Sequence, residues 1–383
     1  MGRFFLPFLF ISSCHAFHST LPSSSSLTTR RRRVHEVLRR SGASQEEQKG
    51  WVGGDEEELE PLPIADEFRA AISKDGLVSA KAVVTSNMIR DISQGQGALP
   101  LAAAALGRSI TCCILMADGL KQEETFQVRF QGDGPLNGVL AVANGRLEAR
   151  GMCGNPKVSL PPNSKGKLDV GAGVGKGNLF VVRAKMLPGD PGPSPYSSVT
   201  QIRSGEVPED INFYLAESEQ REGALAAGVH VDEEGVVDAA GGWTVQLLPG
   251  ATDEAAERLM ANLEAMSDKA PTTMVQSGMG PTEMLELILD GMEPEFFPSR
   301  TPVKTPNCCS YEKVMRTINL LPVREVVQVV ENNEEISVKC EFCGKIRTLE
   351  KQDIQDNLER RLKEAVNTIR EKEVPTVPEP EFD

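Results

Sequence analysis

Residues 124–145 read ETFQVRFQGDGPLNGVLAVANG. Apolar side chains occupy every second position of ETFQVRF, which is typical of a half-buried strand. The segment QGDGP that follows is rich in turn residues. Gly132 and Gly134 are free to take positive φ, and Asp133 is expected to bond the local backbone. The stretch therefore predicts a β-hairpin.

Further strand-like runs follow this hairpin along the chain. Each is short, apolar and bounded by Gly, Asn or Pro, which favours a mixed or antiparallel sheet. A run that begins at Pro208 and carries acids in its first turn predicts one helix across the sheet. We therefore predict an α+β domain over residues 67–250. The strand-like runs are LEARGM (147–152), LFVVRAKM (179–186), ALAAGVHV (224–231) and GGWTVQLLPG (241–250).

The segment LPLAAAALGRSITCCILMADGL (99–120) is apolar on all sides, which predicts a buried helix. A helical stretch before it is expected to be broken by Gly95 and Gly97. Cys112 and Cys113 lie inside the buried segment. We expect them to pack there as small apolar side chains rather than to react.

Residues 251–300 predict a helical linker after this domain. Apolar residues recur at helical spacing in 253–266 and 282–292, with a breaker at 278–281. The methionines fit core packing or an adaptable binding surface, because an unbranched thioether fits many shapes; the pattern favours core packing. Residues 351–383 predict a C-terminal helix followed by an acidic tail without order.

Four cysteines gather late in the chain: Cys308 and Cys309 in NCCS, and Cys340 and Cys343 in CEFCG. Two close pairs of thiolates suit tetrahedral Zn²⁺, since the CxxC spacing lets both sulfurs reach one ion at about 2.3 Å. Adjacent cysteines are unusual at zinc, because neighbouring side chains tend to diverge. The pattern favours an all-cysteine zinc site, with a metal-free dithiol or buried thiols as the alternative.

His230 is the one histidine after residue 40, and it lies in an apolar strand. A Ser/His/Asp or Cys/His enzyme would depend on it, whereas a surface or sheet position is the simpler interpretation. GAGVGKG (171–177) begins like a phosphate loop, but Lys176 stands where GxGxxG needs glycine. That segment is expected to form a turn before a strand. We expect neither a nucleotide site nor an enzyme.

The charge of the chain is strongly asymmetric. Its net charge is −14, yet residues 1–40 hold seven Lys and Arg against the single acid Glu36, which leaves 34 basic against 54 acidic residues, or about −20, for the rest. An acidic body repels phosphate backbones, so nucleic acid is not an expected partner. No segment after the N-terminal region is expected to span a membrane.

The N-terminal residues predict two targeting signals in tandem. Residues 1–16 carry a short apolar run behind Arg3, as in a secretory signal peptide. Residues 17–66 begin with Phe17 and a Ser- and Thr-rich, Arg-containing stretch typical of a transit peptide, and end in an acidic linker. The pair resembles the bipartite presequence of algae with secondary plastids. We predict import to the plastid stroma, with the secretory pathway or cytoplasm as the alternative.

The order of these motifs resembles the heat-shock protein 33 family. The matching pieces are ETFQVRF with QGDGP, VANG and ARG, the glycine-rich turn before LFVVRAKM, the helix ending in SEQ (218–220), and CEFCG, over roughly residues 75–350. The resemblance implies a chaperone that holds unfolding proteins without ATP. Such a protein is silent while reduced and zinc-bound, and is active once disulfides form and zinc leaves. It implies a switchable linker at 251–300 and a zinc-binding redox domain at 301–350.

The resemblance also implies roles for individual residues. Cys309, Cys340 and Cys343 would bind zinc and act as redox centres. The family has CxC followed by Ser. In NCCS, Asn307 occupies the position of the family's first cysteine, which leaves Cys308 to serve as the fourth ligand. A disulfide between the adjacent cysteines would close a strained ring. We therefore predict that the Cys340–Cys343 disulfide is the principal switch and that zinc is held less tightly than usual.

The implied partners are unfolded or partly folded client proteins and, in the oxidised state, a second copy of the chain. Two other functions share the cysteine cluster. A thiol-disulfide oxidoreductase would use Cys340 and Cys343 catalytically, but CEFCG lacks the strand-then-helix placement of such motifs. A zinc-ribbon module would bind nucleic acid, against which the acidic body argues.

Overall fold

The computed structural model describes residues 60–122, 124–185, 196–332 and 336–373. The predicted signal peptide, almost all of the transit peptide and linker, and the end of the acidic tail lie outside these residues. Two compact units emerge from the contacts within the chain. Of the described residues, the core unit holds those in 60–306 together with Glu341–Gly344, and the C-terminal unit holds those in 307–340 and 345–373.

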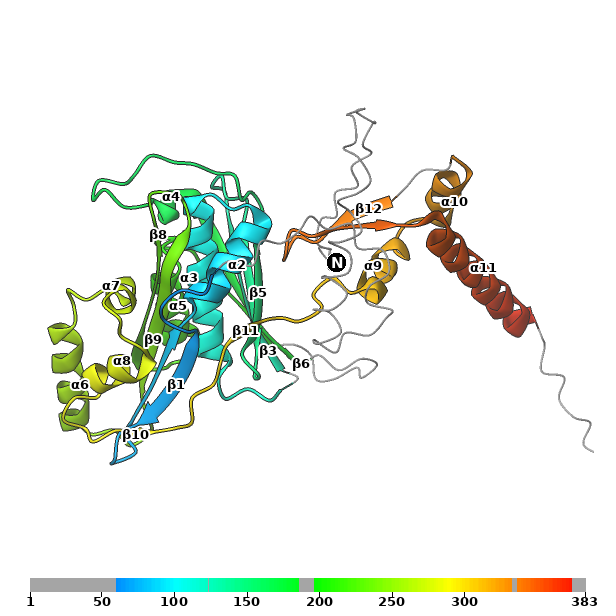
Figure 1. Ribbon diagram of the computed structural model, residues 1–383. Coiled ribbons are helices and arrows are strands. Elements are labelled where there is room, and N and C mark those ends of the chain that lie inside the picture. Colours follow the sequence, from blue (N-terminus) through cyan, green and yellow to red (C-terminus); the bar gives the residue numbers. More distant parts are fainter. Residues whose placement is uncertain (1–59, 123, 186–195, 333–335, 374–383) are drawn as a thin grey trace, which may run out of the picture. The chain divides into compact units, whose positions relative to one another are not determined.

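Two sheets form the core unit (Figure 1). All pairs within the five-stranded sheet are antiparallel, and the six-stranded sheet adds one parallel pair, β5 with β11. The predicted α+β class with a mixed sheet is confirmed. The first sheet has the order β10 (Glu295–Phe296), β1 (Glu67–Ile72), β2 (Val78–Val84), β9 (Val237–Leu247) and β8 (Gly223–Val231). The second has the order β11 (Val303–Lys304), β5 (Glu148–Cys153), β4 (Val139–Asn144), β3 (Glu124–Gly132), β6 (Gly177–Lys185) and β7 (Tyr196–Gln201).

Helix α3 (Pro100–Ala117) lies between the two sheets and packs on strands of both (Figure 1). Its position explains why it is apolar on every side, as the sequence predicted. Cys112 and Cys113 are fully buried in it, so their expected packing role is confirmed. By length and composition α3 would also pass as a membrane span, contrary to the expectation that no such segment exists, but nearly all of it is buried inside the core unit.

Helix α2 (Ser86–Gln96) precedes α3 and continues through Gly95, where the sequence predicted a break. It ends at Gly97, which adopts the left-handed conformation with φ 61° and donates to the carbonyls of Ser93 and Gln94. Only the second of the two glycines therefore acts as a helix terminator. The backbone of Gly95 lies against that of Cys343.

The QGDGP turn joins β3 to β4 as predicted, but its glycines serve a different purpose. Neither Gly132 nor Gly134 has positive φ. A Cβ at Gly134 would instead lie 2.3 Å from the carbonyl oxygen of Gly173, so both glycines allow close backbone approach. Asp133 was expected to bond the local backbone, and its Oδ1 accepts a hydrogen bond from the distant backbone amide of Lys176 at 2.7 Å.

GAGVGKG contains a short helix, α4 (Val170–Val174), rather than a simple turn. The Asp169 side chain caps it by accepting from the amide of Ala172. The carbonyls of Gly173 and Val174 accept hydrogen bonds from Leu136 and Gly134, so this glycine-rich segment supports the β3–β4 turn. A further helix, α5 (Pro208–Ser218), occurs where the sequence predicted one.

Three helices cover the outer face of the five-stranded sheet: α6 (Asp253–Ala265), α7 (Pro271–Gln276) and α8 (Pro281–Ile288) (Figure 1). The strands present small side chains there, and the helices fill the space with larger ones. Met274, Met284 and Leu285 are buried, which confirms core packing for these methionines, whereas Met260 is 61% exposed. The short helix α7 was not predicted.

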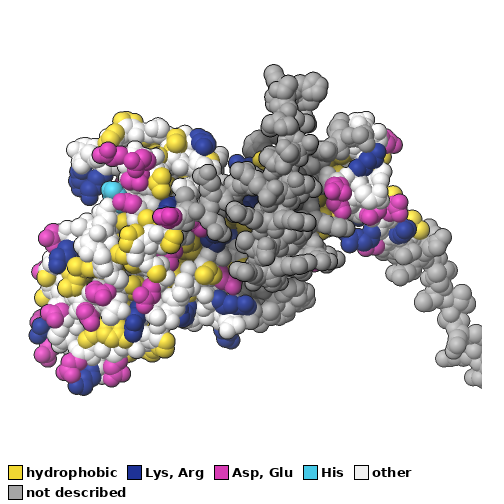
Figure 2. Space-filling view, in the orientation of Figure 1, with side chains coloured by type: hydrophobic (Ala, Val, Ile, Leu, Met, Phe, Trp, Pro, Cys, Tyr) yellow, Lys and Arg dark blue, Asp and Glu magenta, His cyan; other side chains and the backbone are white. Residues whose placement is uncertain are grey.

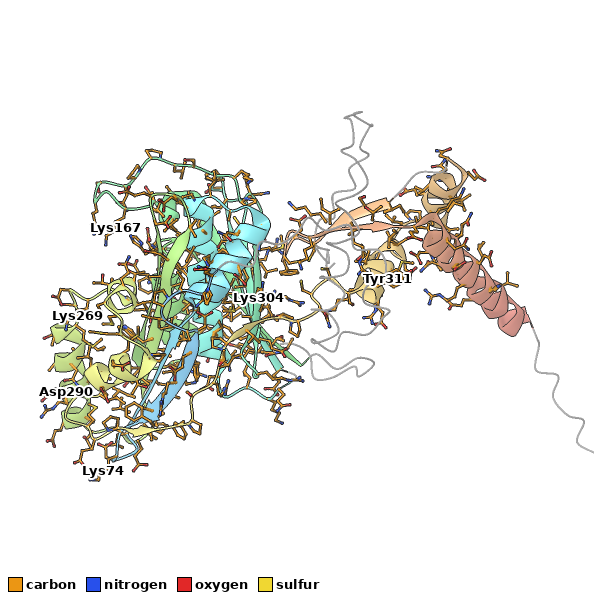
Figure 3. The ribbon with its side chains drawn as sticks, viewed as in Figure 1. Lys74, Lys167, Lys269, Asp290, Lys304 and Tyr311 are labelled. Atoms are coloured by element: carbon orange, nitrogen blue, oxygen red, sulfur yellow. The ribbon has the colours of Figure 1, made fainter. Side chains whose placement is uncertain are left out.

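The chain after α8 adds a strand to each sheet, which the sequence did not indicate. β10 pairs with β1, and β11 pairs with β5. Lys304, labelled in Figure 3, extends from β11 to an ion pair with Asp91 of α2 at 3.1 Å. Residues 295–304 are therefore tied to both sheets of the core unit.

The C-terminal unit has a small core of its own. Its elements are α9 (Tyr311–Ile318), α10 (Val323–Glu331), the hairpin of β12 (Ile336–Lys339) and β13 (Ile346–Leu349), and α11 (Lys351–Glu373). The core consists of eight buried apolar side chains among the described residues. So small a core supplies little folding free energy, and domains of this kind usually need a metal or disulfide.

The surface carries both signs of charge. On the face that Figure 2 shows, acidic and basic side chains are interspersed over the core unit, and no broad basic area covers it there. This distribution agrees with the acidic composition of the body.

Candidate metal centre

Cys308 and Cys309 lie in a tight turn before α9. Asn307 adopts positive φ, 49°, which asparagine tolerates better than most residues. Its carbonyl accepts from the amide of Ser310 at 3.4 Å and from the ammonium group of Lys313 at 2.6 Å. Asn307 thus shapes the turn that carries the two adjacent cysteines.

Cys340 and Cys343 lie in the turn between β12 and β13. The amide of Cys340 donates to the carbonyl of Lys345 at 2.8 Å, which closes the turn. Gly344 has a φ of 72°, a conformation that glycine adopts without steric cost. The CxxC sequence with a following glycine is therefore folded as a compact loop that carries both thiols.

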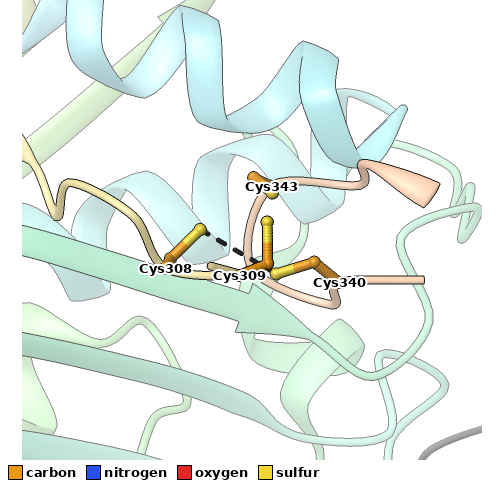
Figure 4. Close-up of side chains that lie close together, drawn as sticks. All are labelled: Cys308, Cys309, Cys340 and Cys343. Carbon is orange, nitrogen blue, oxygen red and sulfur yellow. Dashed lines mark hydrogen bonds between the residues drawn. The ribbon is translucent and has the colours of Figure 1, made fainter. Parts of the chain in front are cut away.

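The four cysteines come together (Figure 4). Their sulfur atoms all lie within 4.8 Å of one another, and the Sγ atoms of Cys308 and Cys340 are 3.9 Å apart. Four sulfurs at about 2.3 Å from a tetrahedral Zn²⁺ would be about 3.8 Å apart. The adjacent pair, which the sequence suggested would diverge, reaches the same point. The cluster could hold one metal ion.

Arg347 on β13 supports the cluster from within the C-terminal unit. Its side chain is 2% exposed, and its guanidinium lies 5.5 Å from the ring centre of Tyr311. Burial lowers the pKa of Arg347, and the charge of Cys309 opposes that shift. Burial, followed by a hydrogen bond to Asp353, raises the pKa of Tyr311 to about 12. A positive charge beside a thiol favours the thiolate that metals bind.

The other three described cysteines are buried in the core unit. Burial raises the pKa of the Cys112 and Cys113 thiols, and it raises that of Cys153 to about 11. The Cys153 Sγ lies 3.5 Å from the carbonyl oxygens of Leu136 and Asn155. These thiols are protonated at neutral pH and are enclosed by the core.

We expect iodoacetamide at pH 8 to leave Cys112, Cys113 and Cys153 unmodified in the native protein. A raised pKa keeps each thiol protonated at this pH, and only the thiolate attacks the reagent. Peptide mass spectrometry should show all three carboxamidomethylated only after guanidinium unfolding. Rapid native labelling of any of them would contradict the assignment.

His230 lies on β8 with its side chain exposed, as predicted. Its Nδ1 lies 2.6 Å from Oδ1 of Asp238. This surface pair joins a histidine to a carboxylate. It gives no support to hydrolase chemistry.

Two residues that contact the cysteine hairpin were not singled out from the sequence. Gln96 of α2 and Arg150 of β5 both contact Phe342, which lies inside the CxxC loop. Gln96 and Arg150 are distant in sequence from these cysteines, and nothing in the ARG segment that contains Arg150 indicates a contact with the CxxC loop, so no local pattern could have identified them.

Comparison with known proteins agrees with this arrangement. The Hsp33 protein family model matches residues 66–350. The 33 kDa chaperonins of Acaryochloris marina and Nostoc sp. are each 37% identical to 74% of this chain, over 93% and 92% of their own lengths. The crystal structure of the 33 kDa chaperonin (heat shock protein 33 homolog) from Thermotoga maritima matches with a TM-score of 0.69 and 27% identity, covering 78% of this chain and all of its own. The chain therefore belongs to the Hsp33 family.

Proposed function

We propose that this protein is a redox-regulated, ATP-independent holdase that binds unfolding proteins under oxidative stress. The observation that carries the proposal is the cluster of four cysteine sulfurs in a unit with a very small apolar core. Membership of a family whose relatives are named 33 kDa chaperonins supports it. The protein works by binding client chains rather than by catalysis.

We propose Zn²⁺ as the ion that the cluster takes. The donor set consists of Cys308, Cys309, Cys340 and Cys343, and four thiolates favour soft or borderline metals over Ca²⁺ or Mg²⁺. Bound zinc would hold the thiolates together and supply folding free energy to the C-terminal unit. Around it, Asn307 and Gly344 shape the two loops, and Arg347 contributes positive charge.

Oxidation by a peroxide would convert two of these thiolates into a disulfide. The sulfur of one thiolate attacks a peroxide oxygen, the O–O bond breaks, and hydroxide leaves. The second thiolate attacks the resulting sulfenic sulfur, forms the S–S bond and releases a second hydroxide. The two sulfurs lose two electrons, hydrogen peroxide gains them, and solvent protons convert the hydroxides to water. We propose Cys340 and Cys343 as the pair, since they share one short loop.

The linker would then uncover the client-binding surface. Helices α6 to α8 cover an outer sheet face made of small apolar side chains, and their own apolar residues are buried against it. If the C-terminal unit unfolds, the segment that follows α8 is left tied to the core unit through the two-residue strands β10 and β11, which are too short to hold the linker helices by themselves. Release of these helices would expose both apolar surfaces to unfolding proteins.

We further propose that the oxidised protein forms a homodimer, because newly exposed apolar surface favours association. The acidic body argues against nucleic acid as a partner, and the burial of α3 argues against a membrane.

The tandem N-terminal signals support import into the plastid stroma. Fusing residues 1–45 to a fluorescent reporter tests this; secretion of the reporter would rule it out.

The thiol-disulfide oxidoreductase remains the second candidate because of the CxxC loop. That loop lies between two strands of a hairpin, not between a strand and the start of a helix. Reduction of insulin disulfides by the purified protein would favour it over the holdase.

We expect the purified, reduced protein to contain about one zinc per chain and to leave the aggregation of a heat-unfolding test protein unchanged. After peroxide treatment, zinc should be released and aggregation should be suppressed. Light scattering and a zinc-responsive dye measure the two effects on one sample. A reduced protein without metal that behaves identically after oxidation would contradict the proposal.

A further inference from the structure

The loop Glu341–Gly344, which contains Cys343, belongs to the core unit although the strands that carry it do not. This loop contacts α2 and β5 through three kinds of interaction. They involve a side-chain amide, a cation over an aromatic ring, and two glycines in backbone contact.

Gln96 joins the loop to β5. Its side-chain amide nitrogen donates to the carbonyl of Gly151 at 2.8 Å and to that of Phe342 at 3.0 Å. Its amide oxygen accepts from the backbone of Cys153 at 3.4 Å. The side chain is 7% exposed, so losing its partners would leave buried polar groups unsatisfied.

Arg150 holds the same loop from β5. Its guanidinium carbon lies 4.8 Å from the ring centre of Phe342, which is the geometry of a cation–π contact. Phe342 is one of the two residues between Cys340 and Cys343. The contact therefore fixes the middle of the CxxC sequence.

The backbones of the loop and of α2 also lie close together. A Cβ at Gly95 would lie 2.7 Å from the carbonyl oxygen of Cys343, and one at Gly344 would lie 1.6 Å from the carbonyl oxygen of Gly95. Any side chain at either position would force the loop and α2 apart. This explains why a glycine occupies an interior position of α2, where it costs helix stability.

We propose that the core unit is a docking site for the CxxC loop, and that this docking sets how readily the cysteines lose their metal and become oxidised. The inference rests on the proposed function and names a regulatory contact for it. Docking stabilises the loop in the conformation that presents Cys343 to the cluster. The coupling is reciprocal, so loss of the metal weakens docking by the same free energy by which docking strengthens metal binding. Gln96, Arg150 and Gly95 are positioning residues in this scheme.

The decisive variant is Gly95→Ala. Alanine is a better helix former than glycine, so α2 itself should not be weakened, while the added methyl group displaces the carbonyl of Cys343. We expect peroxide-induced zinc release, followed with a coloured chelator, to be about tenfold faster, as the loss of one or two net hydrogen bonds would predict. Alkylation of Cys343 in the reduced protein should accelerate in parallel.

Gln94→Ala is the matched control, because Gln94 lies on the same helix and is exposed. Gln96→Leu is a second variant that keeps the side-chain bulk and removes the hydrogen bonds, and it should also release zinc faster. Near-UV circular dichroism confirms that the core is intact.

Equal zinc-release rates in the wild type, the control and both docking variants would overturn the docking proposal and leave the holdase function standing. A wild-type protein without zinc or oxidant-dependent chaperone activity would instead defeat the proposed function, and the docking proposal with it.

Discussion

Replacing Cys343 by serine is expected to abolish stoichiometric zinc binding and to unfold the C-terminal unit. Serine cannot supply the thiolate that a tetrahedral site needs, and zinc contributes on the order of 10 kcal/mol to the folding of small zinc domains. The eight buried apolar side chains of that unit cannot offset such a loss. Atomic absorption and hydrogen exchange over β12 and β13 measure the two effects.

Cys153→Ser is the matched control for this prediction. Cys153 is 2% exposed, and a serine hydroxyl can take over the contacts of its sulfur with two backbone carbonyls. This variant should keep its zinc and its redox response. If Cys343→Ser still carried one zinc per chain, the all-cysteine site would be wrong.

Replacing Leu285 by aspartate should give a chaperone that is active without oxidant. Leu285 is fully buried where α8 packs on the five-stranded sheet. Truncating a buried leucine alone costs about 2–5 kcal/mol, and a buried unpaired carboxylate adds a desolvation cost. The linker helices should therefore detach while the metal stays bound. Aggregation suppression and dye binding to exposed apolar surface, both in reductant, test this.

Met260→Asp is the control, since it places the same charge on the same linker at a position that is 61% exposed. It should remain inactive until oxidised. If Leu285→Asp bound the dye but did not suppress aggregation, the surface beneath the linker would not be the client site.

Local patterns in the sequence predicted most elements of the core unit. Three features each depend on interactions within one segment: the alternation of apolar residues in β3, the long apolar run of α3 and the proline at the start of α5. Each of these elements was found where it was expected. The strands β10 and β11 were missed because each has two residues, too few for a period to be seen. Gly132 and Gly134 were predicted as turn formers, but their close backbone neighbours lie far away in sequence.

The candidate site was only partly predictable for the same reason. Spacing identified the four cysteines, because CxxC and an adjacent pair are local features. The convergence of the Cys308 and Cys309 side chains depends on the left-handed backbone conformation of Asn307, which the spacing of the cysteines does not indicate. The contacts of Gln96 and Arg150 with Phe342 join three distant segments, so they required the tertiary structure.

The pairing of β2 with β9 has a consequence for how this protein is made. Ala82 lies opposite Trp243, so the centre of the five-stranded sheet cannot form until most of the core unit is available. Until then, the apolar surface of α3 has no cover on that side. Contacts between such distant segments slow folding. A chain that emerges gradually during synthesis is therefore itself prone to aggregation and would depend on other chaperones before it can act as one.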